Sequence, residues 1–142
     1  MYKRQGQSTP PSDLGPVLAI SAGDYHSCAI KMDQRIKCWG FNSFGQSTPP
    51  SDLGPVLAVS AGWYNACATQ MDQSIKCWGD NGDNQSTPPS DLGPVHAIYA
   101  GKFHTCAIKM DRSVKCWGTN EEGQSTPHEG LKILIPEEKE EL

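Results

Sequence analysis

The residues best suited to chemistry are six cysteines, which fall into three pairs about ten residues apart. An even number of cysteines in a short chain is typical of a disulfide framework, provided that the compartment is oxidising. The alternative is that all six are small buried thiols on a core face. The pairs are Cys28 with Cys38, Cys67 with Cys77, and Cys106 with Cys116.

Histidines close to these cysteines raise zinc binding as a second chemistry. His26 and His104 each stand two residues before a cysteine, but Asn65 takes this place in the middle of the chain. Structural zinc sites usually use closely spaced cysteine pairs such as C-x-x-C, which this sequence lacks. We therefore predict no metal site and no cofactor. Both histidines are interpreted as strand-end side chains bonded to a neighbouring backbone group.

Composition and charge exclude several classes of function. The sequence shows no Ser-His-Asp set, no phosphate-binding loop and no paired-carboxylate motif, so we expect a protein that is not an enzyme. A net charge of -4 over 142 residues leaves no basic surface for nucleic acid. No apolar stretch is long enough to cross a bilayer, so a membrane is not expected as a partner.

A tandem repeat must position the cysteines. Segments beginning at Gln7, Gln46 and Gln85 align without a gap at a period of about 39 residues, which is typical of solenoids, propellers and arrays. Because repeats bury their apolar faces against neighbours, we expect either a fragment of a longer array or self-association through open repeat ends. The predicted units are a partial repeat at 1–6, repeats at 7–45, 46–84 and 85–123, a partial repeat at 124–136, and an acidic tail at 137–142.

Each pair of cysteines flanks an alternating pattern that predicts a β-hairpin. In the first repeat the turn falls at residues 32–34, and a two-residue turn would set apolar residues opposite charged ones. A three-residue loop instead sets Ile30 opposite Ile36 and the two cysteines opposite each other. Their Cα atoms would then lie about 4.5 Å apart, within reach of a disulfide. We predict the three-residue loop and therefore a staple across each hairpin.

Two turn positions are predicted to need a left-handed backbone. The third residue of each hairpin loop is one of them, although none of its three occupants is glycine. The other holds Gly45 and Gly123, matched by Asn84, the residue that best tolerates positive φ after glycine. The hairpin-loop occupants are Gln34, Gln73 and Arg112.

Tryptophan and proline recur at fixed places in the unit. One tryptophan per repeat, each followed by glycine, is interpreted as a packing platform between stacked repeats. The segment PPSDLGP lacks backbone donors, so it is predicted to be a stiff connector that cannot join a central strand. The three tryptophans are Trp39, Trp78 and Trp117.

The motif AGDYHSCAIKMDQRIKCWGFNSFGQ and its two counterparts resemble the regulator of chromosome condensation repeat family. The Ala-Gly before the hairpin, the aromatic-His step, the Trp-Gly pair with its following Asn, and the Gly-Gln carry the resemblance. The short period is also similar to that of the β-lactamase inhibitor protein of this superfamily. The resemblance implies a propeller with four-stranded blades, commonly seven, that contacts proteins.

This chain departs from the family in having about three repeats, where a closed ring needs at least four. Its hairpin turn also lacks the usual Asp-Gly. No residue for nucleotide exchange or for β-lactamase inhibition can be carried over. The predicted fold class is all-β, a partial or incomplete propeller of about three blades with cysteine-flanked hairpins.

Positions that differ between the repeats cluster in two loops, and variable loops of repeat proteins commonly line one binding face. We predict a non-catalytic protein-binding module there, with drift at unconstrained surface positions as the alternative. A structural spacer array or gene fragment without a ligand is the rival function. The candidate aromatic anchors are Tyr25, Phe41, Phe44, Trp63, Tyr64 and Phe103. The candidate charged residues are Asp24, Asp83 and Lys102.

The compartment stays open at this stage. Paired cysteines favour a secreted or cell-surface protein. The stretch from Met1 to Thr9 lacks the apolar core of a secretion signal, which favours the cytoplasm if the start is genuine.

Overall fold

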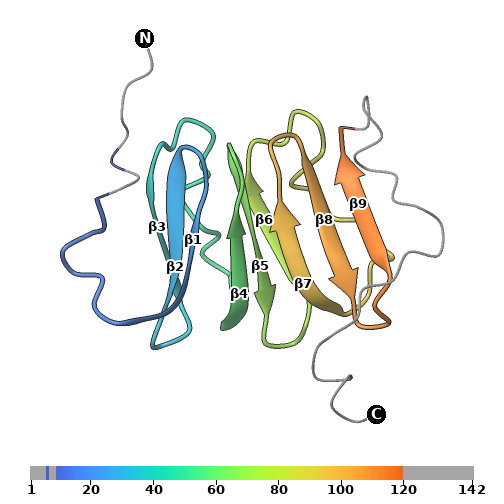
Figure 1. Ribbon diagram of the computed structural model, residues 1–142, viewed down its shortest axis with the longest axis horizontal. Coiled ribbons are helices and arrows are strands. Elements are labelled where there is room, and N and C mark those ends of the chain that lie inside the picture. The colour runs from blue at the N-terminus through green and yellow to red at the C-terminus, as the bar shows by residue number, and fades with distance from the viewer. Residues whose placement is uncertain (1–5, 7–8, 120–142) are drawn as a thin grey trace.

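Three antiparallel sheets follow one another along the chain in the computed structural model, which describes Gly6 and residues 9–119 (Figure 1). The first sheet holds β1 (Val17–Ala22), β2 (His26–Lys31) and β3 (Ile36–Gly40). The second holds β4 (Val56–Ala61), β5 (Asn65–Gln70) and β6 (Ile75–Gly79). The third holds β7 (Val95–Ala100), β8 (His104–Lys109) and β9 (Val114–Gly118).

The hairpin register is the predicted one. Ile30 pairs with Ile36 and Cys28 with Cys38, and the same pairing recurs in the other two sheets. The amide of Gln34 donates to the carbonyl of Lys31 at 2.9 Å, which closes a turn across a three-residue loop. The third loop residue has positive φ in every hairpin, as expected: 68° at Gln34, 70° at Gln73 and 72° at Arg112.

A disulfide joins the two strands of every hairpin, which confirms the predicted pairing and excludes the reading of six free thiols. The paired Cα atoms lie 4.0 to 4.1 Å apart, slightly closer than expected. By the loop-entropy account, closing so short a loop contributes about 3 kcal/mol to stability. Each staple therefore offsets the backbone cost of the non-glycine residue at its turn.

Each of the three described sheets has three strands, so the expectation of four-stranded blades is wrong for these sheets. The proline-rich connector stands where a further strand would be, and it turns instead. The amide of Leu53 donates to the carbonyl of Pro50 at 3.2 Å, and Leu92 to Pro89 at 3.3 Å. Because prolines supply no amide donors, this segment cannot extend a sheet.

Neighbouring sheets pack face to face around two apolar clusters. The first includes Ile30 of the first sheet with Val56 and Trp78 of the second. The second includes Cys67 of the second sheet with Val95 and Trp117 of the third. Trp78 and Trp117 therefore do pack between repeats, as predicted.

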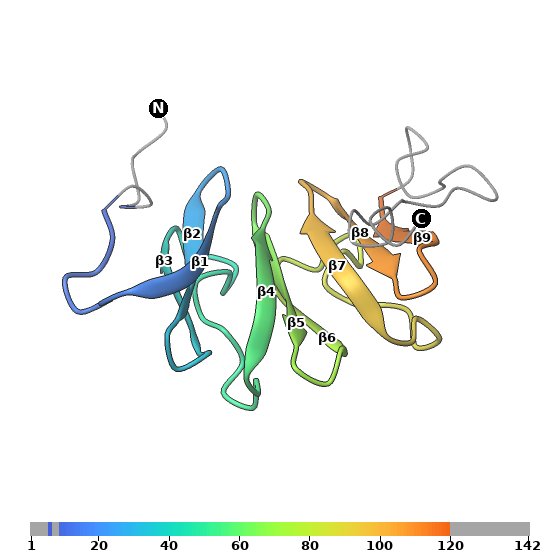
Figure 2. The same ribbon diagram turned by 60° about the horizontal axis from the view of Figure 1, so that its bottom comes forward.

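Repeated hydrogen bonds fix the position of each sheet against the next. The hydroxyl of Ser21 accepts from the amide of Ala61 at 3.0 Å, and the carbonyl of Gln34 accepts from the amide of Val56 at 3.0 Å. The strands β1, β4 and β7 contact one another in order, so the sheets fan out from this side (Figure 2). At this line Gly23 is required, because a Cβ there would overlap the carbonyl oxygen of Gly62.

The first sheet leaves apolar side chains exposed that are covered in the others. Val17 is 36% exposed, whereas its counterparts Val56 and Val95 are 2% and 1% exposed. Self-association through such a face stays a prediction. The partial repeats predicted at 1–6 and 124–136, the acidic tail at 137–142 and the turn at Gly123 lie outside the described residues, apart from Gly6.

Candidate functional site

All nine predicted binding residues lie at one end of the sheets, where the first strand meets the second and the third strand ends. We call this end, formed by residues 23–25, 41–45, 62–64, 80–84 and 101–103, the loop end. The stapled hairpin turns lie at the opposite end of the strands. The frame is thus nearly identical from repeat to repeat, whereas the loop end changes.

Five aromatic side chains of the loop end form one contact set, which we call the aromatic patch. The rings of Tyr25 and Tyr64 stack at 5.1 Å with an angle of 5° between their planes. Phe44 lies 5.1 Å and Phe41 5.9 Å from the Tyr64 ring, and Trp63 meets Tyr25 edge-on at 5.9 Å. The patch joins the first repeat to the second, so neither repeat forms it alone.

The patch is open to solvent. Phe44 is 48% exposed, and the other four rings are half-buried. Rings held in place by ring contacts lose little freedom on binding, and Trp and Tyr are the residues most often found at binding hot spots. The chemistry available here is apolar and π contact, with two phenolic hydroxyls at its centre.

Charged groups border the patch. The ammonium of Lys102 lies 4.0 Å from the centroid of the Trp63 ring and 4.9 Å from that of Phe103. A hydrogen bond with Tyr64 raises the pKa of Tyr25, partial burial and the charge of Asp24 raise it further, and Lys102 lowers it. Asp24 and Lys102 therefore both act on the patch, which brings eight of the nine candidates together.

Asp83 is the candidate that no described contact joins to the patch. Its amide donates to Oε1 of Gln85 at 2.9 Å within its own loop. Its carboxylate is exposed and makes no hydrogen bond or ion pair in the described part of the chain.

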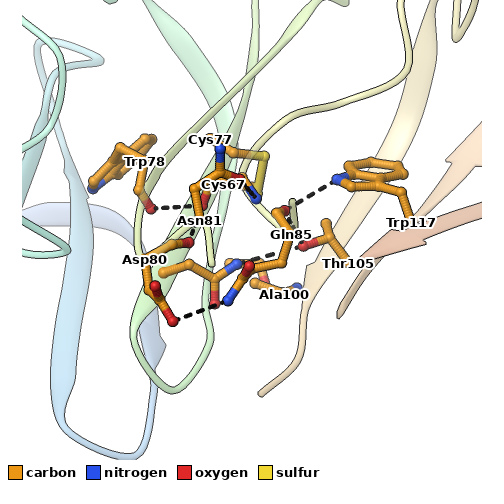
Figure 3. The surroundings of a disulfide bond; sticks show 12 residues. Cys67, Cys77, Trp78, Asp80, Asn81, Gln85, Ala100, Thr105 and Trp117 are labelled. Carbon is orange, nitrogen blue, oxygen red and sulfur yellow. Dashed lines mark hydrogen bonds between the residues drawn. A yellow bond between two sulfur atoms is a disulfide. The ribbon is translucent and has the colours of Figure 1, made fainter. Parts of the chain in front are cut away.

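A buried glutamine organises each loop, and sequence reasoning missed its role. The side chain of Gln85 is fully buried; its Oε1 accepts from Asp83, and its Nε2 donates to Oδ2 of Asp80 at 3.2 Å. Its carbonyl accepts from Nε1 of Trp117 at 3.0 Å and from Oγ1 of Thr105 at 2.8 Å (Figure 3). The signal was present in the sequence as the glutamine that every repeat shares.

The equivalent glutamine one repeat earlier, Gln46, lacks half of these bonds. Gln46 is also fully buried, and its Oε1 accepts from the amide of Phe44 at 3.0 Å. Its Nε2 has no partner among the described residues, because Phe41 stands where Asp80 stands in the next repeat. A buried donor without a partner costs about 1 to 3 kcal/mol.

His26 lies behind the first loop, fully buried. Burial lowers its pKa to about 4, and the nearby backbone of Trp63 opposes this shift. The backbone of Trp63 is the group that the predicted hydrogen bond would use, although neither ring nitrogen meets hydrogen-bond geometry with a described residue. Among those residues no group of histidine, cysteine or acidic side chains could hold a metal ion.

Two cavities lie away from the patch. The larger, of about 530 Å³, is bounded by Asp33, Arg35 and the connector after β3. The smaller, of about 300 Å³, is its counterpart one repeat later. Both lie beside the stapled hairpins, and their lining residues hold no arrangement of nucleophile, acid and base. In the described residues, no helix is long and apolar enough to cross a membrane.

Three-stranded sheets that fan out in chain order, each carrying the same stapled hairpin, define a tandem-repeat protein with propeller blades. Comparison with known proteins supports the same class of protein. The family model of the regulator of chromosome condensation (RCC1) repeat matches residues 17–46 and 95–124. These two stretches are therefore similar to repeats of this family.

Solved structures show the same fold. The ectodomain of the Arabidopsis thaliana receptor kinase ACR4 is similar at 29% identity and a TM-score of 0.69, over 84% of this chain and 42% of that one. The ectodomain of the Physcomitrella patens receptor kinase CR4 is similar at 29% identity and 0.63, over 75% and 31%. Prp20p of Saccharomyces cerevisiae, studied for its binding to Gsp1p and histones, shares 18% identity at 0.66, over 80% and 36%.

The chain thus spans less than half the length of these structures. No curated protein matches the chain significantly. Repeats of this family generally form interaction and regulatory folds rather than enzymes.

Proposed function

We propose that the chain is a protein-binding module whose contact surface is the aromatic patch. The family assignment supports an interaction fold, but fold alone does not locate a site. The patch supplies the site: it is concentrated, partly exposed, built from two repeats, and rich in the residue types that dominate protein interfaces.

The observation that carries this proposal is a difference between two loops. The first loop has a phenyl ring at the position where the second loop has a carboxylate bonded to the side-chain amide of a buried glutamine. Asp80 satisfies Gln85, whereas Phe41 leaves Gln46 unsatisfied and contributes instead to the patch. A change that lowers stability and exposes an aromatic ring is typical of a functional position. Drift at unconstrained positions gives no reason for Phe41, Phe44 and Trp63, which have no aromatic counterparts in the other two complete repeats, to gather on the two shared tyrosines.

Binding can be tested with a library of displayed protein fragments passed over the immobilised full chain. Replacing Tyr64, the ring at the centre of the patch, by alanine should weaken retained fragments about 30-fold, the effect of losing a hot-spot residue. Met71→Ala, at the hairpin end and 48% exposed, is the matched control and should leave binding unchanged. Equal retention by the two variants would contradict the proposal.

A further inference from the structure

The charges of the loop end are unbalanced. Among its described residues, carboxylates stand at Asp24, Asp80 and Asp83, and the ammonium of Lys102 is the single opposing charge. Lys102 forms no ion pair with any of them, since its ammonium lies over the Trp63 ring. The surface around the aromatic patch is therefore acidic, and it presents carboxylates that a partner can reach.

The patch itself holds a cation. An aromatic face carries negative charge in its quadrupole and attracts ammonium and guanidinium groups within about 6 Å. Lys102 meets this condition over Trp63 at 4.0 Å. The contact shows within the molecule which kind of group these rings accept.

Aromatic rings and carboxylates occupy neighbouring loops because the same loop positions recur in each repeat. Phe41 and Phe44 in the first loop correspond to Asp80 and Asp83 in the second. A segment that crosses from the first repeat toward the third thus passes from aromatic rings to carboxylates. Asp80 is held by Gly82 and Gln85, but the carboxylate of Asp83 is exposed and without a described partner.

We infer that the partner presents a basic segment, with a lysine or arginine side chain on the aromatic patch and further positive charge facing Asp24 and Asp83. The inference rests on the proposed function and specifies its partner. Cation-π contact supplies part of the affinity, and charge complementarity sets specificity and association rate. A phosphate-rich partner would be repelled by the carboxylates, and a neutral glycan would not use them.

Random dodecapeptides displayed on phage and panned on the full chain provide the probe. Sequences that bind native protein but not Tyr64→Ala should be enriched in lysine and arginine. Their affinity should fall about tenfold in the double variant Asp24→Asn/Asp83→Asn, as expected for two lost charge contacts. The double variant Asp13→Asn/Asp91→Asn has the same change of charge in the connectors, and it should stay within about twofold of native.

Lys102→Met sharpens the test, because it frees the Trp63 face and removes a like charge. Affinity for the selected basic peptides should rise about threefold. An acidic partner would instead lose affinity, which would overturn the inference.

The two proposals fail in different ways. Peptides that require Tyr64 but carry no excess of basic residues and ignore the charge variants would overturn the basic segment and leave the binding surface standing. A neutral oligosaccharide that binds the native chain and displaces the peptides would also overturn it. If no peptide depends on Tyr64, both proposals are wrong.

Discussion

The loops at 41–48 and 80–87 share one backbone design and differ in what they present. In both, the side-chain oxygen of an asparagine accepts from the backbone amide of the serine five residues later, Ser47 to Asn42 and Ser86 to Asn81. Both cover a buried glutamine. The second loop satisfies that glutamine with a carboxylate, and the first loop places an aromatic ring there instead.

The two loops show how a repeat protein can keep a stable frame while its binding surface changes. Sheet register, disulfides and sheet-to-sheet hydrogen bonds recur almost unchanged, so the frame stays constant while loop side chains vary. The unpartnered side-chain nitrogen of Gln46 belongs to the loop that carries Phe41 and Phe44, two rings of the aromatic patch. The comparison therefore predicts which changes affect the frame and which affect the surface.

Removing a staple should have the largest effect, because both loops continue from stapled hairpins. The double variant Cys28→Ala/Cys38→Ala should lower the free energy of unfolding by about 3 kcal/mol, measured by urea denaturation. Cys67→Ala/Cys77→Ala removes the equivalent disulfide of the second hairpin. It should lower the free energy of unfolding by the same amount, within about 1 kcal/mol. If only one of the two double variants loses stability, the two disulfides do not stabilise the loops equally.

The repeats also differ behind the loops, where His26 corresponds to Asn65. Because its folded pKa of about 4 lies below the unfolded value of 6.5, the folded state keeps the neutral ring. The free energy of unfolding that depends on this neutral ring is fully present above pH 6.5. It is lost as the pH falls toward 4, by about 3 kcal/mol. Urea midpoints measured across this range should show the decline.

His26→Asn is the control, since it copies the second repeat and should flatten this part of the pH profile. The carboxyls of Asp52 and Asp72, whose pKa values lie below 3.8, titrate beneath this window. A decline that persists in His26→Asn would assign it to another group.

Asp80→Ala should convert the second loop into the unsatisfied state of the first. It removes the acceptors of the Gly82 amide and of Gln85 Nε2, so unfolding should become easier by about 2 kcal/mol. Asp83→Ala, in the same loop, removes a carboxylate without a described partner and should change stability by less than about 0.5 kcal/mol. Equal effects would mean that the buried amide does not distinguish the two loops.

Most of the frame could be predicted from the sequence, because it depends on local rules. The alternation around residues 32–34 set the hairpin register, and the register set the sulfur pairing. The prolines correctly indicated a connector, whereas the family resemblance wrongly implied a fourth strand. Local hydrogen-bond chemistry was the better guide in that region.

The site was harder to predict, because it depends on contacts between repeats. Comparing the repeats found the residues of the aromatic patch, but not that Tyr25 stacks on Tyr64, which lies one repeat away. The bond between Asp80 and Gln85 could not be predicted either, since a glutamine that recurs in every repeat does not reveal its hydrogen-bond partner. His26 was expected to bond the backbone, but its full burial beside the Trp63 backbone of the next repeat could not be predicted from spacing.

Phe41→Asp separates stability from binding in the first loop, because it gives that loop the carboxylate of the second. Unfolding free energy and affinity for patch-dependent peptides would be measured on the same preparation. We predict that stability is unchanged or higher by up to about 1 kcal/mol, since Gln46 gains an acceptor, while affinity falls about 30-fold. A variant that loses about 2 kcal/mol of stability and keeps its affinity would contradict the account.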